Sequence, residues 1–243
     1  MRTLIVGISL PNASFDNASF LSAPSFSEYS RVIVEMASIA KSVQDAVDGS
    51  PTAVTFGGQA VVNGSASAHA FPLRDLLEMR RREAEWVLRG NGLIAVIGHP
   101  PGAVPGIDGL MTWTNYSWLP EPGGVTFSDL LQPGFGREGA VLTDSDHAFA
   151  PYVSELAGRI GYRVTADEEG PGFGESGRVF ARSPGGAAIG FQVNAGGGTI
   201  VVLPALNNAD RDRQQLAGAM VECLARWDSS RTSADTESKT GAN

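Results

Sequence analysis

Residues 71–105, FPLRDLLEMRRREAEWVLRGNGLIAVIGHPPGAVP, decide the fold of this chain. Pro72 suits the first turn of a helix, where its missing N–H has no intrahelical partner to lose. Apolar side chains then recur at steps of three and four residues, which places them on one helical face. They are Leu73, Leu76, Leu77, Ala84, Val87 and Leu88. Gly90 and Gly92 permit the positive φ with which many helices end, so the stretch predicts a long helix and a sharp turn.

A strand without polar residues follows this turn. Residues 93–98, LIAVIG, are apolar on both faces, which is typical of a parallel sheet that helices cover on both sides. Ligands of such sheets collect at the carboxyl ends of the strands. His99 follows the strand and is therefore a candidate site residue, although His-Pro-Pro also suits a rigid strand exit.

The rest of the chain supplies further strands for the same sheet. Residues 3–8 and 31–36 are apolar and β-branched, and both runs predict strands. Two β-rich runs around a glycine pair predict a β-hairpin insertion at about 52–63. Short strands between glycine clusters predict a strand meander at about 162–204, whose last strand returns to the main sheet.

These elements predict a single α/β domain over residues 1–227. The motif NASF occurs at 12–15 and again at 17–20, and this polar, turn-rich duplication predicts a loop. An apolar stripe predicts a last helix at 209–227. Residues 228–243 are polar, and we expect them to form a disordered tail.

Composition and charge argue against several classes of partner. The chain has 243 residues and a formal net charge of −8, and its sequence pI is about 4.9. Nucleic acids and anionic membranes require clustered Lys and Arg, so this balance disfavours both. No apolar run is long enough to span a bilayer or to form a signal peptide, and we expect a cytoplasmic protein.

Few residues offer catalytic chemistry. Cys223 is the single cysteine, and its place in the apolar stripe of the last helix predicts an inert buried thiol. One cysteine also excludes an intramolecular disulfide and a thiolate-rich zinc site. Asp144, Asp146 and His147 suit metal binding or acid–base catalysis, although Asp and Ser at this position also cap helices.

Arg80 interrupts the apolar stripe of the long helix. Its guanidinium must therefore reach solvent or find a buried acid. Glu35 lies within the second predicted strand, which we expect beside residues 93–98, and a buried carboxylate there also needs a partner. We therefore predict a buried ion pair between Arg80 and Glu35.

Three stretches carry a family resemblance: GNGLIAVIGHPPG at 90–102, DHAFAPYV at 146–153, and GGTIVVLPALNNADRDRQQLAGAMVECLARW at 197–227. They resemble the ThuA-like branch of the class I glutamine amidotransferase-like superfamily. This resemblance implies a flavodoxin-like three-layer sandwich with a mostly parallel central sheet, and a site near His99 and His147. Working amidotransferases of this superfamily use a nucleophilic Cys at a strand-to-helix elbow. No cysteine stands at a strand end here, so we expect a degenerate active site without glutamine hydrolysis.

We expect a non-amidotransferase member of this fold that acts as a binding or assembly module in a bacterial-type cytoplasmic complex. Met79 and Trp86 are seven residues apart and lie roughly opposite the core stripe of the long helix. A second apolar stripe on one helix indicates a second packing surface, either for the predicted hairpin insertion or for another protein chain, as a partner or through self-association. A small polar ligand is also compatible with the sequence, and we expect no cofactor.

The alternative is an enzyme, a hydrolase or isomerase, on a small polar or sugar-like substrate. His99 would act as the general base, with His147 or Asp146 as its acid or metal-binding companion. This alternative requires the two histidines to converge, because proton transfer needs hydrogen-bond reach. A third alternative is a metal site formed by His69, His99 and His147.

Overall fold

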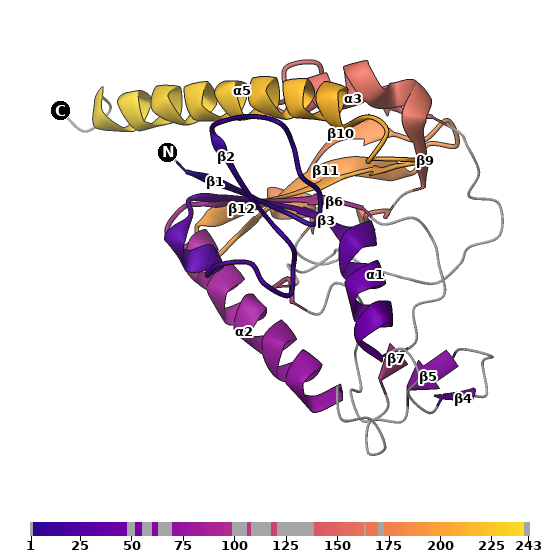
Figure 1. Cartoon of the computed structure of the whole chain (residues 1–243). Coiled ribbons are helices and arrows are strands. Elements are labelled where there is room, and N and C mark those ends of the chain that lie inside the picture. Colours follow the sequence, from indigo (N-terminus) through magenta and orange to yellow (C-terminus); the bar gives the residue numbers. More distant parts are fainter. Residues whose placement is uncertain are drawn as a thin grey trace.

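The computed structural model describes residues 2–47, 52–54, 60–62, 70–98, 106–107, 118–120, 139–162, 164–169 and 173–240. Within these ranges the molecule is built on an eight-stranded sheet of order β2-β1-β3-β6-β12-β11-β10-β8 (Figure 1). The parallel part of the sheet contains β1 (Thr3–Val6), β2 (Phe15–Ala18), β3 (Arg31–Glu35), β6 (Leu93–Ile97) and β12 (Gly198–Leu203). Every residue of β6 is buried, which confirms the predicted central strand.

An antiparallel meander extends the sheet beyond β12. Its strands are β11 (Ala188–Ala195), β10 (Arg178–Arg182) and β8 (Val141–Leu142). The predicted meander is therefore confirmed, and so is the return of its last strand to the main sheet beside β6. Two further strands, β9 (Ile160–Tyr162) and β13 (Ala205–Leu206), form a separate antiparallel pair.

The predicted hairpin insertion is also confirmed. Strand β4 (Thr52–Val54) pairs antiparallel with β5 (Ala60–Val62). Strand β7 (Gly106–Ile107) adds to β5 in parallel, which makes a small three-stranded sheet apart from the central one.

Helices lie on both sides of the central sheet (Figure 1). On one side are α1 (Met36–Val47) and α2 (Ala70–Arg89), and on the other are α3 (Ala150–Leu156) and α5 (Arg213–Thr240). Short helical segments are η1 (Phe26–Glu28), η2 (Ala157–Arg159) and α4 (Phe173–Ser176). This arrangement confirms the predicted flavodoxin-like three-layer sandwich. Within the described ranges, no helix has the length and apolar content needed to cross a membrane.

Successive side chains of the central strands point to opposite faces of the sheet, so the protein has two hydrophobic cores. In β6, Ile94 and Val96 face the core that α2 covers. Leu93, Ala95 and Ile97 face the core that α3 and α5 cover. A strand buried on both faces needs apolar residues at every position, which is why LIAVI has no polar residue.

The turn between α2 and β6 uses its glycines differently from the prediction. The positive φ, 57°, falls on Asn91, a residue type that tolerates this conformation. Gly92 is required for another reason, because a Cβ there would lie 2.6 Å from the carbonyl oxygen of Val87. The chain therefore turns where two backbones approach closely.

Two segments differ from the sequence predictions. Residues 15–18 were predicted as loop but form β2, an edge strand that pairs with β1 through backbone bonds and buries only Phe15. Residues 228–240 were predicted as a disordered tail but continue α5. Asp228 bonds to Arg31 at 2.7 Å and Arg231 bonds to the carbonyl of Asn91, so the helix is held beyond its apolar part. Extending a formed helix is also easier than starting one.

Candidate functional site

The carboxyl ends of the parallel strands form the edge at which the sequence places a site. In the sequence His99 comes two residues after the end of β6, but it lies outside the described residues, and so does His69. The structure therefore describes no distance from His99 to His147. Gly98, the last described residue before it, donates its N–H to the carbonyl of Leu203 at 2.8 Å, which fixes the end of β6 beside the end of β12.

Glu35 occupies the same edge, at the end of β3. Its carboxylate is buried and accepts hydrogen bonds from the backbone N–H of Ala37 at 3.2 Å and of Ser38 at 2.9 Å. The Ser38 hydroxyl lies 2.6 Å from the carboxylate and 2.8 Å from the carbonyl oxygen of Gly7. Because β3 runs directly into α1, Glu35 satisfies the free amides of the first helical turn.

The predicted ion pair between Arg80 and Glu35 is wrong. Arg80 is 2% exposed, as expected from its place in the apolar stripe, but its acidic partner is Glu83 at 2.7 Å. Its guanidinium also donates to the carbonyl oxygens of Ala23, at 2.5 Å, and Pro24, at 3.0 Å. The buried arginine therefore fastens the segment before η1 to α2, and Glu35 is held by α1 instead.

His147 is buried under α3 and has both ring nitrogens engaged. Nδ1 accepts a hydrogen bond from the N–H of Phe149 at 3.1 Å, so Nε2 carries the proton and donates to Gln192 Oε1 at 3.0 Å. The ring stacks on Phe180 with centroids 4.0 Å apart. Burial lowers the pKa of His147 to about 4. The imidazole is therefore neutral and structural in this arrangement.

Asp144 and Asp146, the two acids beside His147, belong to the loop before α3, and Asp144 stabilises that loop. Asp144 accepts from Arg178 at 2.6 Å and from the N–H of Asp146 at 3.1 Å. Burial acts to raise the pKa of Asp144, but the hydrogen bond and charge of Arg178 outweigh it and lower that pKa. The side chain of Asp146 is exposed and has no hydrogen bond to His147 within the described chain. Asp146 and His147 therefore do not form an acid–base pair here.

Lowering the pH should destabilise the protein through His147. The imidazole titrates at 6.5 in the unfolded chain and at about 4 in the folded protein. Between these values the unfolded chain binds more protons, so the free energy of unfolding should fall by up to about 3 kcal/mol as the pH drops. Urea denaturation at several pH values measures this fall. His147→Asn should have a smaller fall between pH 6.5 and 4, and an identical slope would contradict the assignment.

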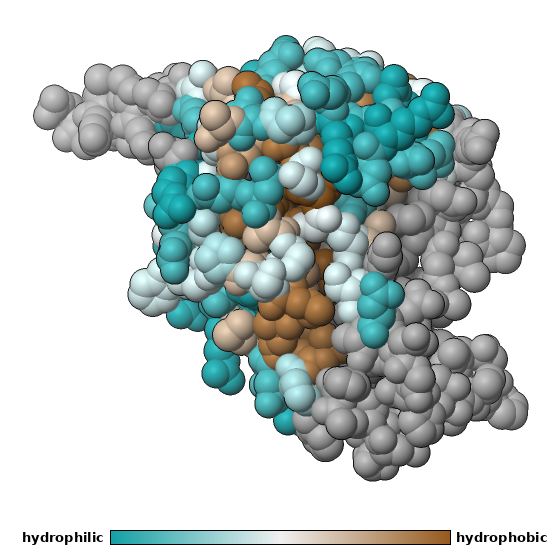
Figure 2. All heavy atoms as spheres, viewed as in Figure 1, coloured by the Kyte–Doolittle hydropathy of each residue, from teal (hydrophilic) through white to brown (hydrophobic). Residues whose placement is uncertain are grey.

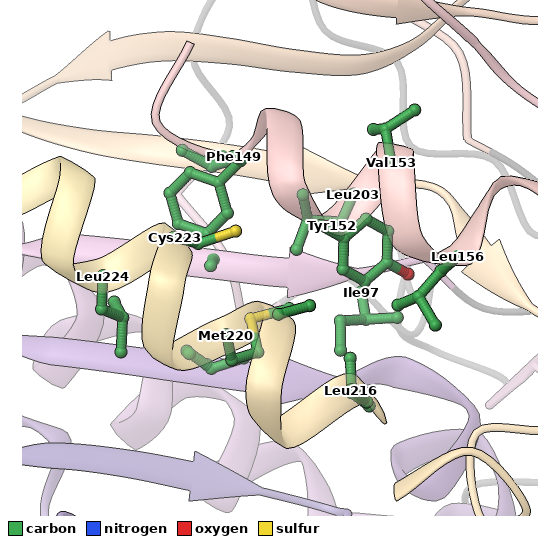
Figure 3. Close-up of a cluster of buried hydrophobic side chains, with 14 of the residues drawn as sticks. Ile97, Phe149, Tyr152, Val153, Leu156, Leu203, Leu216, Met220, Cys223 and Leu224 are labelled. Carbon is green, nitrogen blue, oxygen red and sulfur yellow. The ribbon is translucent and has the colours of Figure 1, made fainter. Parts of the chain in front are cut away.

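Cys223 lies on the buried side of α5, among Phe149, Met220 and Leu224 (Figure 3). Burial raises the pKa of its thiol to about 12. A thiol in this state is not a nucleophile, which agrees with the predicted inert role. In the same core, Tyr152 donates its hydroxyl to the carbonyl oxygen of Pro204 at 2.5 Å, and burial, followed by the charge of Glu35, raises its pKa.

Metal ligands do not gather in the described part of the chain. No group of three or more His, Cys, Asp or Glu side chains there could hold an ion. The proposed trio of His69, His99 and His147 has only its last member within these residues, and both nitrogens of that ring are already bonded.

Met79 and Trp86 lie on the exposed outer face of α2. Met79 is 43% exposed and Trp86 is 64% exposed. Asp75, Arg82 and Arg89 are also exposed, and with Met79 and Trp86 they follow one another at steps of four and three residues. We call these five residues the outer stripe of α2.

Figure 2 shows apolar side chains gathered beside the middle of α2, on its side toward α1 in this view.

A polar pocket of about 450 Å³ opens between η2 and the connection from β13 to α5. It is lined by Gly158, Arg159, Asn207, Asn208, Arg211 and Asp212. The sequence predictions missed all of these residues, because they come from η2 and from the loop after β13, which are far apart in the chain and match no motif. The available signal was the polar run NNADRD directly after the last strands, near the carboxyl end of β12.

Comparisons with known proteins support the fold. No family model and no curated protein sequence matches this chain. Its structure is similar to cytoplasmic protein STM1381 from Salmonella typhimurium LT2, with 13% identity and a TM-score of 0.52 over 93% of this chain and 98% of that chain. It is also similar to cytoplasmic protein STM3548 from Salmonella typhimurium, with 10% identity and a TM-score of 0.51 over 91% and 98%. At such identities these likenesses show the fold alone.

A third structure, a candidate GMP synthase component from Thermoplasma acidophilum, is 10% identical and covers 95% of this chain and 98% of its own. Its TM-score of 0.37 is a value from which no conclusion about fold or function follows.

Proposed function

We propose that this protein is a non-amidotransferase member of the class I amidotransferase-like fold, and that it acts as a self-associating assembly module in the cytoplasm. The observation that carries the proposal is the outer stripe of α2, with Trp86 64% exposed. Trp and Met are enriched at protein interfaces and are energetically important there. The two Salmonella proteins of similar fold are described as cytoplasmic, which supports this location.

The chemistry of the described residues favours binding over catalysis. His147 is neutral and bonded at both nitrogens, and Cys223 has its pKa raised to about 12. Glu35 caps α1. The enzyme alternative now depends on His99, which lies outside the described residues, and on Asp146 as its companion, because both ring nitrogens of His147 are already bonded.

The outer stripe suits a second copy of the same helix in antiparallel orientation. Around a two-fold axis near Arg82, Met79 of one copy would meet Trp86 of the other. Asp75 near the start of α2 would meet Arg89 near its end, which pairs opposite charges twice. This charge complementarity favours self-association over an unrelated partner. A contact made by one helix face buries little area, so we expect weak, concentration-dependent dimers.

The charge at the axis does not prevent this contact. Two copies of Arg82 would approach each other, but Glu78 and Glu85 flank Arg82 on the same helix. All three side chains can reach solvent at the rim of the contact, where like charges cost little.

Trp86→Ala should weaken dimerisation at least about tenfold, because an interfacial tryptophan typically contributes more than about 1.4 kcal/mol. Sedimentation equilibrium over a wide range of protein concentrations measures this change. Asp75→Arg or Arg89→Asp alone should also weaken the dimer, and the two changes together should restore it. Arg81→Ala, on the flank of α2, is the matched control.

Two outcomes would contradict this proposal. One is a wild-type protein that stays monomeric at every concentration. The other is a dimer whose affinity is the same in wild type and Trp86→Ala.

A further inference from the structure

We propose that the polar pocket between η2 and α5 binds a small hydroxylated organic anion, such as a sugar phosphate, with its oxyanion group held by Arg159 and Arg211. This site is separate from the outer stripe of α2 and does not depend on self-association. The pocket is lined on one side by Gly158 and Arg159 and on the other by residues 207–212.

The two walls of the pocket are fixed to each other. Strands β9 and β13 pair through Ala205 with Tyr162 and Leu206 with Ile160, so η2 before β9 and the loop after β13 adjoin the same ladder. Directly after it, the N–H of Asn207 donates to the carbonyl oxygen of Arg159 at 2.8 Å. A pocket with walls held in this way needs little reorganisation to bind a ligand.

Gly161 positions one of the lining side chains. A Cβ built on Gly161 would lie 1.7 Å from Oδ1 of Asn207, so the amide of Asn207 packs directly on the backbone of β9. Only glycine leaves room for the side chain in this place. The amide is therefore held at the pocket, where its oxygen and nitrogen can accept and donate hydrogen bonds to hydroxyl groups.

The charges of the pocket favour an anion. Asp212 is buried and its carboxylate bonds to Arg159, so these two charges compensate each other. Arg211 has no acidic partner among the described residues, and its backbone N–H donates to Asn208 Oδ1 at 3.0 Å. Two residues later Arg213 is held by Asp210 at 2.6 Å.

The guanidinium of Arg211 therefore gives the pocket one uncompensated positive charge, although the whole chain has a formal net charge of −8. The planar guanidinium presents paired N–H donors that match two oxygens of a phosphate or carboxylate. This is the chemistry that recognises the anionic end of the ligand.

Size and position indicate the rest of the ligand. A volume of about 450 Å³ falls within the range of small-molecule sites and exceeds the need of a single phosphate ion. The side chains that line it are all polar, which favours hydroxyl groups over an apolar body. The pocket also lies near the carboxyl end of β12, the edge at which sheets of this class bind ligands.

Isothermal titration calorimetry with the full chain tests the site, with glucose 6-phosphate, inorganic phosphate and glucose as probes. Glucose 6-phosphate should bind saturably, inorganic phosphate more weakly, and glucose should give no binding heat. Arg211→Ala should weaken the binding of glucose 6-phosphate about tenfold or more, because it removes charge-assisted hydrogen bonds. Arg213→Ala is the matched control and should leave the affinity unchanged.

Gly161→Ala gives a second variant that keeps both arginines. Its added Cβ must displace Asn207, so the affinity should fall although the charge is the same. Circular dichroism checks that each variant is folded, and the dimerisation constant of Arg211→Ala should equal that of wild type. The proposal is overturned if the wild type binds neither phosphate probe saturably, or if Arg211→Ala binds glucose 6-phosphate like wild type. Binding of inorganic phosphate without glucose 6-phosphate would also overturn the assignment to an organic anion.

Discussion

Arg80→Ala should lower the free energy of unfolding by about 3–5 kcal/mol, the usual effect of removing one partner of a buried ion pair. The truncation leaves the carbonyl oxygens of Ala23 and Pro24 without their donors and Glu83 without its cation. It also removes the guanidinium that lies 4.7 Å from the ring centroid of Phe26. Urea denaturation followed by circular dichroism measures the change.

Arg81→Ala provides the control on the same helix. Arg81 is exposed and contacts Glu85 at 3.8 Å, so its loss should change stability by less than about 0.5 kcal/mol. The stability of Arg80→Lys should lie between those of Arg80→Ala and Arg81→Ala, because an ammonium keeps the charge but cannot reach several carbonyl oxygens at once. If Arg80→Ala is as stable as Arg81→Ala, the buried arginine does not fasten the segment before η1 to α2.

Phe180→Ala should be comparably damaging, with a loss of about 3–5 kcal/mol. Phe180 is fully buried in β10, and its ring stacks on His147 at 4.0 Å with an interplanar angle of 9°. Its removal leaves a cavity beside the imidazole, and water entering that cavity would stabilise the imidazolium. The pKa of His147, followed by NMR, should then rise from about 4 toward 6.5.

Val141→Ala is the matched control for Phe180→Ala. Val141 belongs to β8, which pairs with β10, but its side chain is exposed. Its truncation should change stability by less than about 0.5 kcal/mol and leave the titration of His147 unchanged. A Phe180→Ala protein with wild-type stability would mean that the stacked pair does not support the core under α3.

The sequence predicts correctly those elements whose apolar pattern follows directly from which of their faces are buried. Strand β6 is buried on both sides, so its five residues are all apolar. Helix α2 carries a stripe at steps of three and four because one face packs on the sheet. Edge strand β2 has no such constraint, since backbone bonds to β1 hold it and only Phe15 is buried. A polar strand of this kind cannot be told from a loop by its residues.

Contacts between distant segments were harder to predict than burial. The pattern places Arg80 inside the core stripe, and the structure agrees, but its partners are carbonyl oxygens of a loop and Glu83 on its own helix. Glu35 has an equally local partner in the first turn of α1. Backbone groups have no sequence signature, so pairing two charged side chains across the core was the wrong inference.

The polar pocket was missed for a related reason. Arg159 ends η2 and Arg211 lies in the loop after β13, and the pairing of β9 with β13 brings these two segments together. Only Ile160, Tyr162, Ala205 and Leu206 form that pairing. No turn motif connects the two strands, so the sequence does not indicate that they pair. By contrast, Met79 and Trp86 could be placed on one surface from the sequence, because both lie on one helix at a spacing of seven residues.

The place of β12 in the sheet has a consequence for how the protein forms during synthesis. Strand β12 lies between β6 and β11, yet the ribosome produces it only after β8, β10 and β11. Until it emerges, one edge of β6 has unpaired backbone N–H and C=O groups between apolar side chains, and β11 lacks the strand that joins the meander to the rest of the sheet. Non-local pairing of this kind slows folding and leaves nascent chains prone to aggregation. The parallel and antiparallel halves of the sheet are therefore expected to join only late in translation, once β12 has been synthesised.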